Sequence, residues 1–190
     1  NIDVASAVAI FSIESGGHGF WKDGHCLIRF ETHVFHKFWG KDNQGEFDAH
    51  FKFNPQRGWT GQAYRASAQD NWTELHTGSD AQRHEWEALG IARKLNSDAA
   101  LRSMSMGAPQ ILGSNYARIG YNNVQEMFES FNKDIRFHIF GFFDFLSDEM
   151  MKHIRDKDYK AFARDYNGAG NATHYGKKIK EYDNLFKKLS

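Results

Sequence analysis

The chain has 190 residues, a length that suits one domain with a sizeable core. Its net charge of zero argues against a protein whose main partner is nucleic acid, because such proteins carry a strongly basic face. A lone cysteine, Cys26, excludes a scaffold held by internal disulfides. With only two prolines and helical periodicity along most of its length, the chain is predicted to be mainly α.

Two elements are predicted at the N-terminal end. A helix is expected over residues 3–15, and it ends where glycines at 16, 17 and 19 open the chain. Residues 20–30 contain Asp23-Gly24, a pair typical of hairpin turns, between aromatic and aliphatic residues. We therefore expect a short two-stranded ribbon directly after the first helix.

The middle of the chain alternates short helices with an irregular stretch. A short helix is predicted over 31–39, and residues 40–72 are expected to be the least regular segment. Three aromatic residues indicate that this segment packs against the rest of the protein: Trp59, Tyr64 and Trp72. Ser79-Asp80 is a capping signal for a helix that runs to about residue 95, and residues 96–98 cap another helix through 102.

The C-terminal half is predicted to be helical after one turn. Residues 105–112 indicate a Gly-Pro turn that leads into a helix near 110–118, with Pro109 in its first turn. Further helices are expected at 122–131, 133–147 and 158–166, and from the end of the loop 167–173 to residue 189. The aromatic-rich helix among them is expected to be the buried central one. Without repeats or linkers, residues 1–190 are predicted to form a single domain.

Glu14 is a carboxylate that helical periodicity places on the apolar face of the first helix. A helical wheel puts it between Ile10 and Ala7, in the last turn before the glycines. A carboxyl group against apolar side chains has a raised pKa, which suits a general acid at neutral pH. The alternative reading is a frayed helix end whose Glu14 points to water, and the helix alone leaves both open.

Three motifs then occur in order: ESGG at 14–17, SMGAPQIL at 105–112 and DYNGAG at 165–170. Together they resemble the lysozyme-like superfamily of goose-type lysozymes and soluble lytic transglycosylases. The chain is more similar to the phage-type N-acetylmuramidase domain found in endolysins of phages that infect Gram-negative bacteria. That likeness extends over nearly the whole chain through FETHVF (30–35), AALRSMSMGAPQILG (99–113) and FARDYNGAGNATHYGKKI (162–179). It is weakest at 40–75, and Met104 and Met106 depart from the usual pattern.

The resemblance implies a mainly α, lysozyme-like single domain with a small β-hairpin at the cleft edge. It implies cleavage of the β-1,4 bond between N-acetylmuramic acid and N-acetylglucosamine in peptidoglycan, without a cofactor, and Glu14 as the acid. A second carboxylate is needed to stabilise the oxocarbenium-like charge or to activate water. Glu31 lies just beyond the predicted ribbon and is favoured over Asp23, with His33 as its candidate orienting partner. The alternative for Glu31 is a helix N-terminal residue favoured by the dipole.

Substrate-binding roles are implied for a second group of residues. Gln110, at the start of its predicted helix, is expected to bond a sugar N-acetyl or hydroxyl group. Tyr166 is expected to donate its hydroxyl to the catalytic carboxyl, and Asn167 to bind an acetamido group. Ser105 and Tyr175 are weaker candidates for the cleft. The run 166–168 is equally typical of a helix C-cap, and both readings are compatible.

Other readings of the same sequence remain. Glu31, His33 and His36 have a spacing that suggests a metal site, but the zincin pattern is absent and no metal is expected. A lytic transglycosylase giving anhydromuramic products is one alternative function, and a non-catalytic peptidoglycan-binding module is another. The intact ESGG motif argues against the latter.

The remaining expectations concern partners and location. The glycan strand of peptidoglycan is the expected partner of a monomer. The last helix carries lysines that allow weak contact with anionic lipid or lipopolysaccharide: Lys177, Lys178, Lys180, Lys187 and Lys188. No signal peptide is visible, since residues 2–13 lack a basic n-region. An endolysin of this kind is therefore expected to be made in the cytoplasm of the bacterial host and to act on the wall in the periplasm.

Overall fold

Helices and two small sheets make up residues 2–189, which the computed structural model describes. The longer helices are α1 (Val4–Ser15), α4 (Ala81–Leu95), α6 (Val124–Lys133), α7 (Ile135–Phe145), α9 (Tyr159–Asn167) and α10 (Ala172–Leu189). The shorter ones are α2 (Thr32–Phe38), α3 (Gln44–His50), α5 (Ser97–Arg102), α8 (Asp148–Arg155) and the 3-10 helices η1 (Gly40–Asp42), η2 (Gly113–Ile119) and η3 (Ala169–Asn171). This composition confirms the prediction of a mainly α fold.

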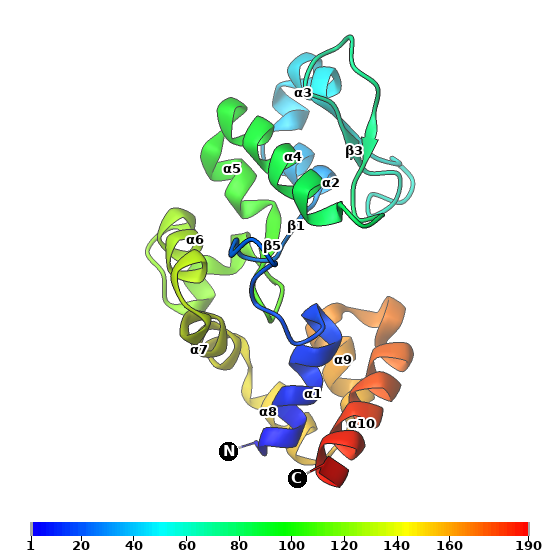
Figure 1. Ribbon diagram of the computed structural model, residues 1–190, viewed down its shortest axis with the longest axis vertical. Coiled ribbons are helices and arrows are strands. Elements are labelled where there is room, and N and C mark those ends of the chain that lie inside the picture. The colour runs from blue at the N-terminus through cyan, green and yellow to red at the C-terminus, as the bar shows by residue number, and fades with distance from the viewer. Residues whose placement is uncertain (1, 190) are drawn as a thin grey trace.

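Two antiparallel sheets of three strands lie in the part of the molecule drawn at the centre and top of Figure 1. The first sheet has the order β1-β5-β6, from Ile28–Phe30, Met104–Met106 and Ile111–Leu112. The second has the order β2-β3-β4, from Phe51–Lys52, Ala63–Tyr64 and Thr73–Glu74. In the first sheet Phe30 is paired with Met104 and Ile28 with Met106. The pairing of β1 with β5 therefore joins two segments that lie far apart in the sequence.

Several helix boundaries follow from local side-chain capping, although Asp80, at the N-cap of α4, makes no such hydrogen bond. The Asp3 side chain accepts a hydrogen bond from the backbone N–H of Ser6 at 2.8 Å, and Gly16 ends α1 in the left-handed conformation with a φ of 64°. Asn96 caps α5 by accepting from the N–H of Ala99. The predicted helices at 3–15, 31–39, 81–95, 97–102 and 158–166 are therefore confirmed to within a residue or two.

Two hydrophobic clusters divide the molecule. The larger one fills the sheet-bearing part and includes aromatic residues from β1, α2, α3 and β2: Phe30, Phe35, Phe47 and Phe51. The smaller one joins α1, α7, α8, α9 and α10 at the bottom of Figure 1 through Ile10, Phe142, Ile154, Phe162 and Ile179. We refer to these as the sheet-bearing part and the helical part. The chain crosses from the helical part to the sheet-bearing part directly after α1, which places Gly16 and the following turn between them.

Two local predictions were incomplete and one was wrong. The stretch 20–30 forms only one isolated bridge, Phe20 with Cys26, because its second strand pairs with β5 instead. Residues 40–72 contain a helix, α3, that the polar composition concealed. The segment 110–118 does not begin a helix at Gln110: β5 and β6 form a hairpin around 107–110, and the 3-10 helix η2 starts only at Gly113.

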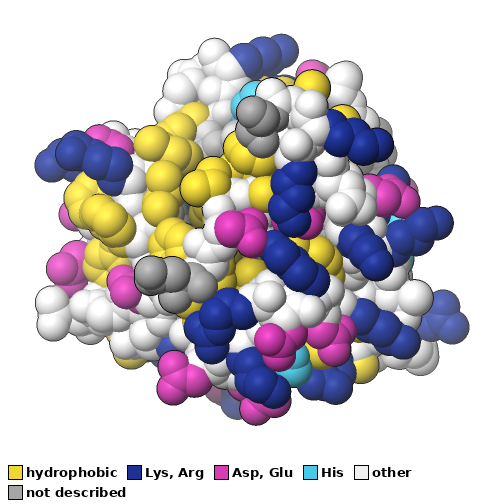
Figure 2. Space-filling model, turned by 90° about the horizontal axis from the view of Figure 1, so that it is seen from below, with side chains coloured by type: hydrophobic (Ala, Val, Ile, Leu, Met, Phe, Trp, Pro, Cys, Tyr) yellow, Lys and Arg dark blue, Asp and Glu magenta, His cyan; other side chains and the backbone are white. Residues whose placement is uncertain are grey.

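The prediction that the aromatic helix is wholly buried also needs correction. In α7, Phe142 is fully buried, whereas Phe140 is 61% exposed and Ile139 is partly exposed. Figure 2 shows hydrophobic side chains gathered on one side of the lower face, with Lys and Arg side chains over much of the rest. No described helix is both long enough and apolar enough to cross a membrane.

Candidate active site

A cavity of about 680 Å³ lies between the two parts of the molecule. The helical part contributes Glu14, Tyr166, Asn167 and Tyr175 from α1, α9 and α10, together with Phe145 of α7. The sheet-bearing part contributes Arg29, Glu31, Trp59, Ser105, Gln110, Ile111, Leu112 and Asn115. The cavity therefore holds seven of the eight predicted site residues, although they come from widely separated segments, and only His33 does not line it.

Glu14 occupies the last turn of α1, where the left-handed Gly16 turns the chain away and leaves the carboxyl group facing the cavity. The side chain keeps part of its surface open to the cavity, but most of its surroundings are protein. Burial raises the pKa of this carboxyl to about 7, and a hydrogen bond from Asn167 opposes that effect. Glu14 therefore retains a proton near neutrality, which is the property of a general acid.

Glu31 occupies the N-cap position of α2, directly after β1, and its backbone N–H donates to the carbonyl of Ser103 at 2.8 Å. Its Oε1 accepts from Nε of Arg29 at 2.7 Å, and its Oε2 accepts from Nε2 of Gln62 at 2.5 Å. Burial raises the pKa of the Glu31 carboxyl, but the charge of Arg29, the hydrogen bond from Gln62 and the charge of His76 outweigh it and lower that pKa. Glu31 is therefore ionised where Glu14 is protonated.

At the end of α9, Asn167 makes the contact with the catalytic carboxyl group that was predicted for Tyr166. The hydroxyl of Tyr166 donates to the carbonyl of Pro109 at 2.8 Å, and it is Nδ2 of Asn167 that donates to Glu14 Oε1, also at 2.8 Å. Burial and the charge of Glu14 together raise the pKa of Tyr166, so the phenol stays protonated. Tyr166 thus ties α9 to the β5–β6 turn, and Asn167 supplies the hydrogen bond to the acid.

Gln110 lies in the β5–β6 turn, where its φ of 50° is left-handed, rather than at a helix start. Its Nε2 donates to the carbonyl of Gly107 at 2.8 Å and more weakly to that of Leu27 at 3.4 Å. The side-chain oxygen is then the part of the amide that can meet a ligand in the cavity. Buried His138 holds this turn, because its Nδ1 accepts from the N–H of Ala108 at 3.1 Å.

The other predicted residues are distributed as follows. Ser105 lies in β5 and Tyr175 in α10, and both line the cavity from opposite walls. His33 lies behind Glu31, with its Nδ1 3.4 Å from Glu31 Oε2. His36 instead meets Gln44, and the described residues contain no cluster of His, Cys, Asp and Glu that could hold a metal ion.

Several residues of the cleft were missed by sequence reasoning. Trp59 lines the cavity while 66% exposed, contrary to the expectation that it packs into the interior. A second cavity of about 370 Å³ adjoins the first, shares Glu14, Arg29 and Gln110 with it, and adds Trp21 and His76. An exposed tryptophan in a glycine-rich loop is the one sequence signal that could have indicated a stacking surface. The cleft is therefore elongated, with Glu14 at the junction of its two cavities.

An open elongated cleft lined by two carboxyl groups, one of raised and one of lowered pKa, is the arrangement expected of a glycosidase. The sequence model of the N-acetylmuramidase family matches residues 3–187, so the chain belongs to this family of peptidoglycan-cleaving muramidases. Among solved structures, the Burkholderia AP3 phage endolysin is similar, with a TM-score of 0.73 and 22% identity. The match covers 98% of this chain and 66% of that one, so this chain spans slightly less than two thirds of the endolysin. No curated protein matches the chain.

These comparisons confirm the predicted resemblance and the lysozyme-like fold. Family membership also favours the muramidase over both alternatives, the lytic transglycosylase and the non-catalytic binding module.

Proposed function

We propose that Glu14 and Glu31 carry out the muramidase reaction on the β-1,4 bond between N-acetylmuramic acid and N-acetylglucosamine. The observation that carries this assignment is the opposed ionisation of two carboxyl groups lining one cavity from opposite parts of the molecule. Inorganic or organic cofactors have no role in the proposed reaction. Both groups act directly on the sugar or on water.

In the first step, Glu14 transfers its proton to the glycosidic oxygen as the bond from that oxygen to the anomeric carbon breaks. The ionised Glu31 stabilises the positive charge that develops on the anomeric carbon and the ring oxygen. A water molecule then forms the new bond to the anomeric carbon and loses a proton to a carboxylate. The products are a free reducing end and a sugar with a free 4-hydroxyl group.

Binding of the glycan strand is assigned to the walls of the cleft. Trp59 presents an exposed indole on which the apolar face of a sugar can stack, and the amide oxygen of Gln110 can accept from a sugar hydroxyl or N-acetyl group. Ser105 and Tyr175 offer hydroxyl groups on opposite walls. Asn167 is proposed to tune Glu14 in addition to contacting an acetamido group.

We further propose that the chain is a single catalytic domain, monomeric, and that it belongs to a bacteriolytic endolysin of the phage type. Such a protein would be made in the host cytoplasm and would act on the wall from the periplasm. Weak contact of α10 with anionic lipid or lipopolysaccharide is a further part of this proposal. Three of the lysines concerned have carboxylate partners within the helix, since Lys177 and Lys178 lie 4.0 Å and 3.4 Å from the Glu181 carboxylate and Lys187 meets Asp183 at 2.6 Å.

The test is mass spectrometry of muropeptides released from purified Gram-negative sacculi by the wild type and by Glu14→Gln. We expect reducing N-acetylmuramic acid ends from the wild type and almost none from the variant. Anhydromuramic ends would keep Glu14 as the acid but replace hydrolysis by transglycosylation. Absence of released products from a folded wild type would overturn the catalytic assignment in favour of a binding module.

A further inference from the structure

His76 and Glu85 are buried groups in the wall of the second cavity of the cleft, and the proposed reaction gives them no role. Glu85 lies in α4 and is 2% exposed, and His76 lies in the loop between β4 and α4 with a 10% exposed side chain. His76 has a φ of 67°, a left-handed conformation that few residues other than glycine adopt. Such backbone strain persists where the surrounding structure holds it, and it often marks a functional site.

Glu85 is held as a carboxylate acceptor by three N–H groups. Its Oε2 accepts from the backbone N–H of Phe30 at 2.7 Å, directly before Glu31 in the chain. Its Oε1 accepts from the backbone N–H of His76 at 3.0 Å and lies 2.8 Å from His76 Nδ1. Glu85 thus fixes both the ring of His76 and the end of β1.

The other nitrogen of His76 faces the second carboxylate of the cleft. His76 Nε2 is buried without a hydrogen-bond partner and lies 4.0 Å from Oε2 of Glu31. Because Nδ1 carries the proton toward Glu85, Nε2 presents either a lone pair or a second N–H to Glu31. A lone pair would repel the Glu31 carboxylate, whereas the imidazolium satisfies a carboxylate at each end.

We propose that His76, held in place by Glu85, is the positioning residue of Glu31 in the muramidase reaction. Its ring keeps Glu31 ionised and oriented toward the cavity, with His76 Nε2 4.0 Å from Glu31 Oε2. This inference rests on the proposed function, since it assigns a partner to Glu31. His76 itself does not touch the reacting atoms, and its effect passes through Glu31.

Other polar groups face Glu31 from different elements, but they are more open to solvent. The Arg29 side chain on β1 is 45% exposed, and the His33 side chain on α2 is 30% exposed. Gln62 donates a hydrogen bond from beside β3 but carries no charge. Solvent screens the exposed charges more strongly than a buried one. The ring of His76 is therefore the most buried of the guanidinium and imidazole groups around Glu31.

The experiment compares His76→Asn, Glu85→Gln and the double variant with the wild type on soluble, uncross-linked glycan strands. Asparagine tolerates the left-handed backbone of His76, but its side chain is too short to reach Glu31 and carries no charge. Glutamine at position 85 keeps the volume and removes the charge. Measurements are kcat, KM and the pH dependence of kcat, with circular dichroism at each pH to establish that the variant is folded. His25→Asn is the matched control, because His25 pairs with Asp23 at 3.3 Å outside the cleft.

We expect His76→Asn to lower kcat about tenfold with KM nearly unchanged, and to move the acid limb of kcat upward by about one pH unit. Glu85→Gln should also lower kcat with KM nearly unchanged, because the ring of His76 loses its carboxylate anchor, and the double variant should have the kcat of His76→Asn because the two residues act as a unit. His25→Asn should match the wild type. An unmoved acid limb in folded His76→Asn, or additive effects of the two substitutions, would overturn the inference.

This outcome is separable from failure of the proposed function. If the wild type releases no reducing ends, the function itself fails. If the wild type is active and Glu14→Gln is inactive while His76→Asn behaves as the wild type, only the role of His76 fails. Should His76→Asn not fold, kcat of folded Glu85→Gln decides alone, and a value equal to that of the wild type would overturn the inference.

Discussion

The helical part and the sheet-bearing part of the molecule each present one carboxyl group to the same cleft, and they shift the pKa of that group in opposite directions. In the helical part, Glu14 ends a helix among apolar side chains and receives one neutral hydrogen bond, from Asn167. In the sheet-bearing part, Glu31 follows a strand and is met by a guanidinium, an amide and two imidazoles. Both residues are glutamates, so their surroundings decide which of the two carboxyl groups is protonated.

This difference matches the architecture of the two parts. Helices that pack side by side leave few unpaired polar groups near Glu14, so burial dominates there. The ends of short strands and the loops between them expose many donors, and several of these converge on Glu31. A cleft between a helical wall and a looped wall thus produces an acid on one side and an anion on the other.

The largest expected effect comes from removing the acid in the helical part. Glu14→Gln should lower kcat/KM by about a thousandfold, the range of a general acid, while the fold is kept. It should also stabilise the protein at pH 8 by about 1–2 kcal/mol, because ionising a partly buried carboxyl of raised pKa costs free energy there. That cost grows as the pH rises from 4.5, the ordinary pKa of a glutamate, to about 7, the pKa of Glu14 in the folded protein.

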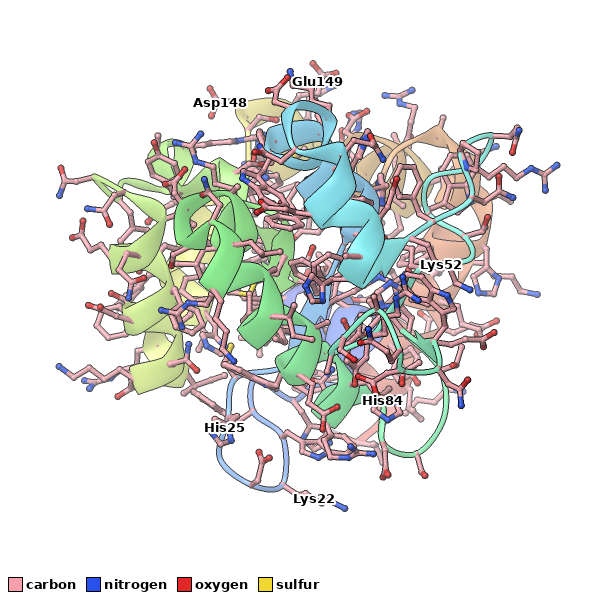
Figure 3. The ribbon with its side chains drawn as sticks, turned by 90° about the horizontal axis from the view of Figure 1, so that it is seen from above. Lys22, His25, Lys52, His84, Asp148 and Glu149 are labelled. Carbon is pink, nitrogen blue, oxygen red and sulfur yellow. The ribbon has the colours of Figure 1, made fainter. Side chains whose placement is uncertain are left out.

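Turbidity loss of sacculi measures the activity of this variant, and thermal unfolding at pH 4 and pH 8 measures its stability. Glu149→Gln is the control, because Glu149 lies on α8 at the edge of the molecule, apart from the cleft (Figure 3). Lytic activity of Glu14→Gln equal to that of the wild type would show that Glu14 is not the general acid.

The next largest effect is expected from the sheet-bearing part. Glu31→Gln should reduce hydrolysis about a hundredfold, because the amide can neither stabilise the oxocarbenium-like charge as an anion nor accept a proton from water. The measurement is the rate of release of reducing ends. A variant that stays mostly active and yields anhydromuramic ends would mean that the second carboxylate is dispensable.

The pH dependence of kcat/KM compares both parts in one experiment. Activity should fall about tenfold per pH unit above pH 7, where Glu14 loses its proton. On the acid side, activity should persist below pH 4.5. The charge of Arg29, the hydrogen bond from Gln62 and the charge of His76 together hold the pKa of Glu31 below that value, although burial raises it. Initial rates on soluble glycan strands in buffers of constant ionic strength provide the profile. An alkaline limb that stays in place in Glu14→Asp would contradict its assignment to this residue.

The smallest expected effect concerns the single hydrogen bond to the acid. Asn167→Ala should lower kcat only a few-fold and move the alkaline limb upward by about half a pH unit, because Asn167 opposes the rise in the pKa of Glu14. Asn115→Ala is the matched control, since Asn115 lines the same cavity from the other wall. Equal profiles for the two variants would show that the contact with Glu14 does not tune the acid.

Sequence reasoning succeeded where the signal is local. The cap at Asn96 and the motifs that line the cleft lie within a few residues of what they specify. The predicted apolar face of the first helix was less accurate, because Ile10 is buried whereas Val4 and Val8 are exposed. Sequence reasoning failed where pairing is long-range: nothing near residues 28–30 indicates that they pair with 104–106 rather than with 20–26.

The same limit explains the errors in the site. Tyr166 and Asn167 are neighbours at a helix end, and which of them reaches Glu14 depends on where the β5–β6 turn places Pro109. His76 and Glu85 carry no motif at all, and only the packing of α4 against β1 brings them to Glu31.

Cys26, the only cysteine of the chain, has a practical consequence. It is fully buried, and burial raises the pKa of its thiol to about 12, so the thiolate that reacts with alkylating reagents is scarce at neutral pH. A cysteine introduced at Lys22, on the exposed turn at the edge of the molecule (Figure 3), would then be the single reactive thiol without any background substitution. The natural sequence is in this sense already prepared for attaching one fluorophore beside the cleft and following the arrival of a glycan strand in real time.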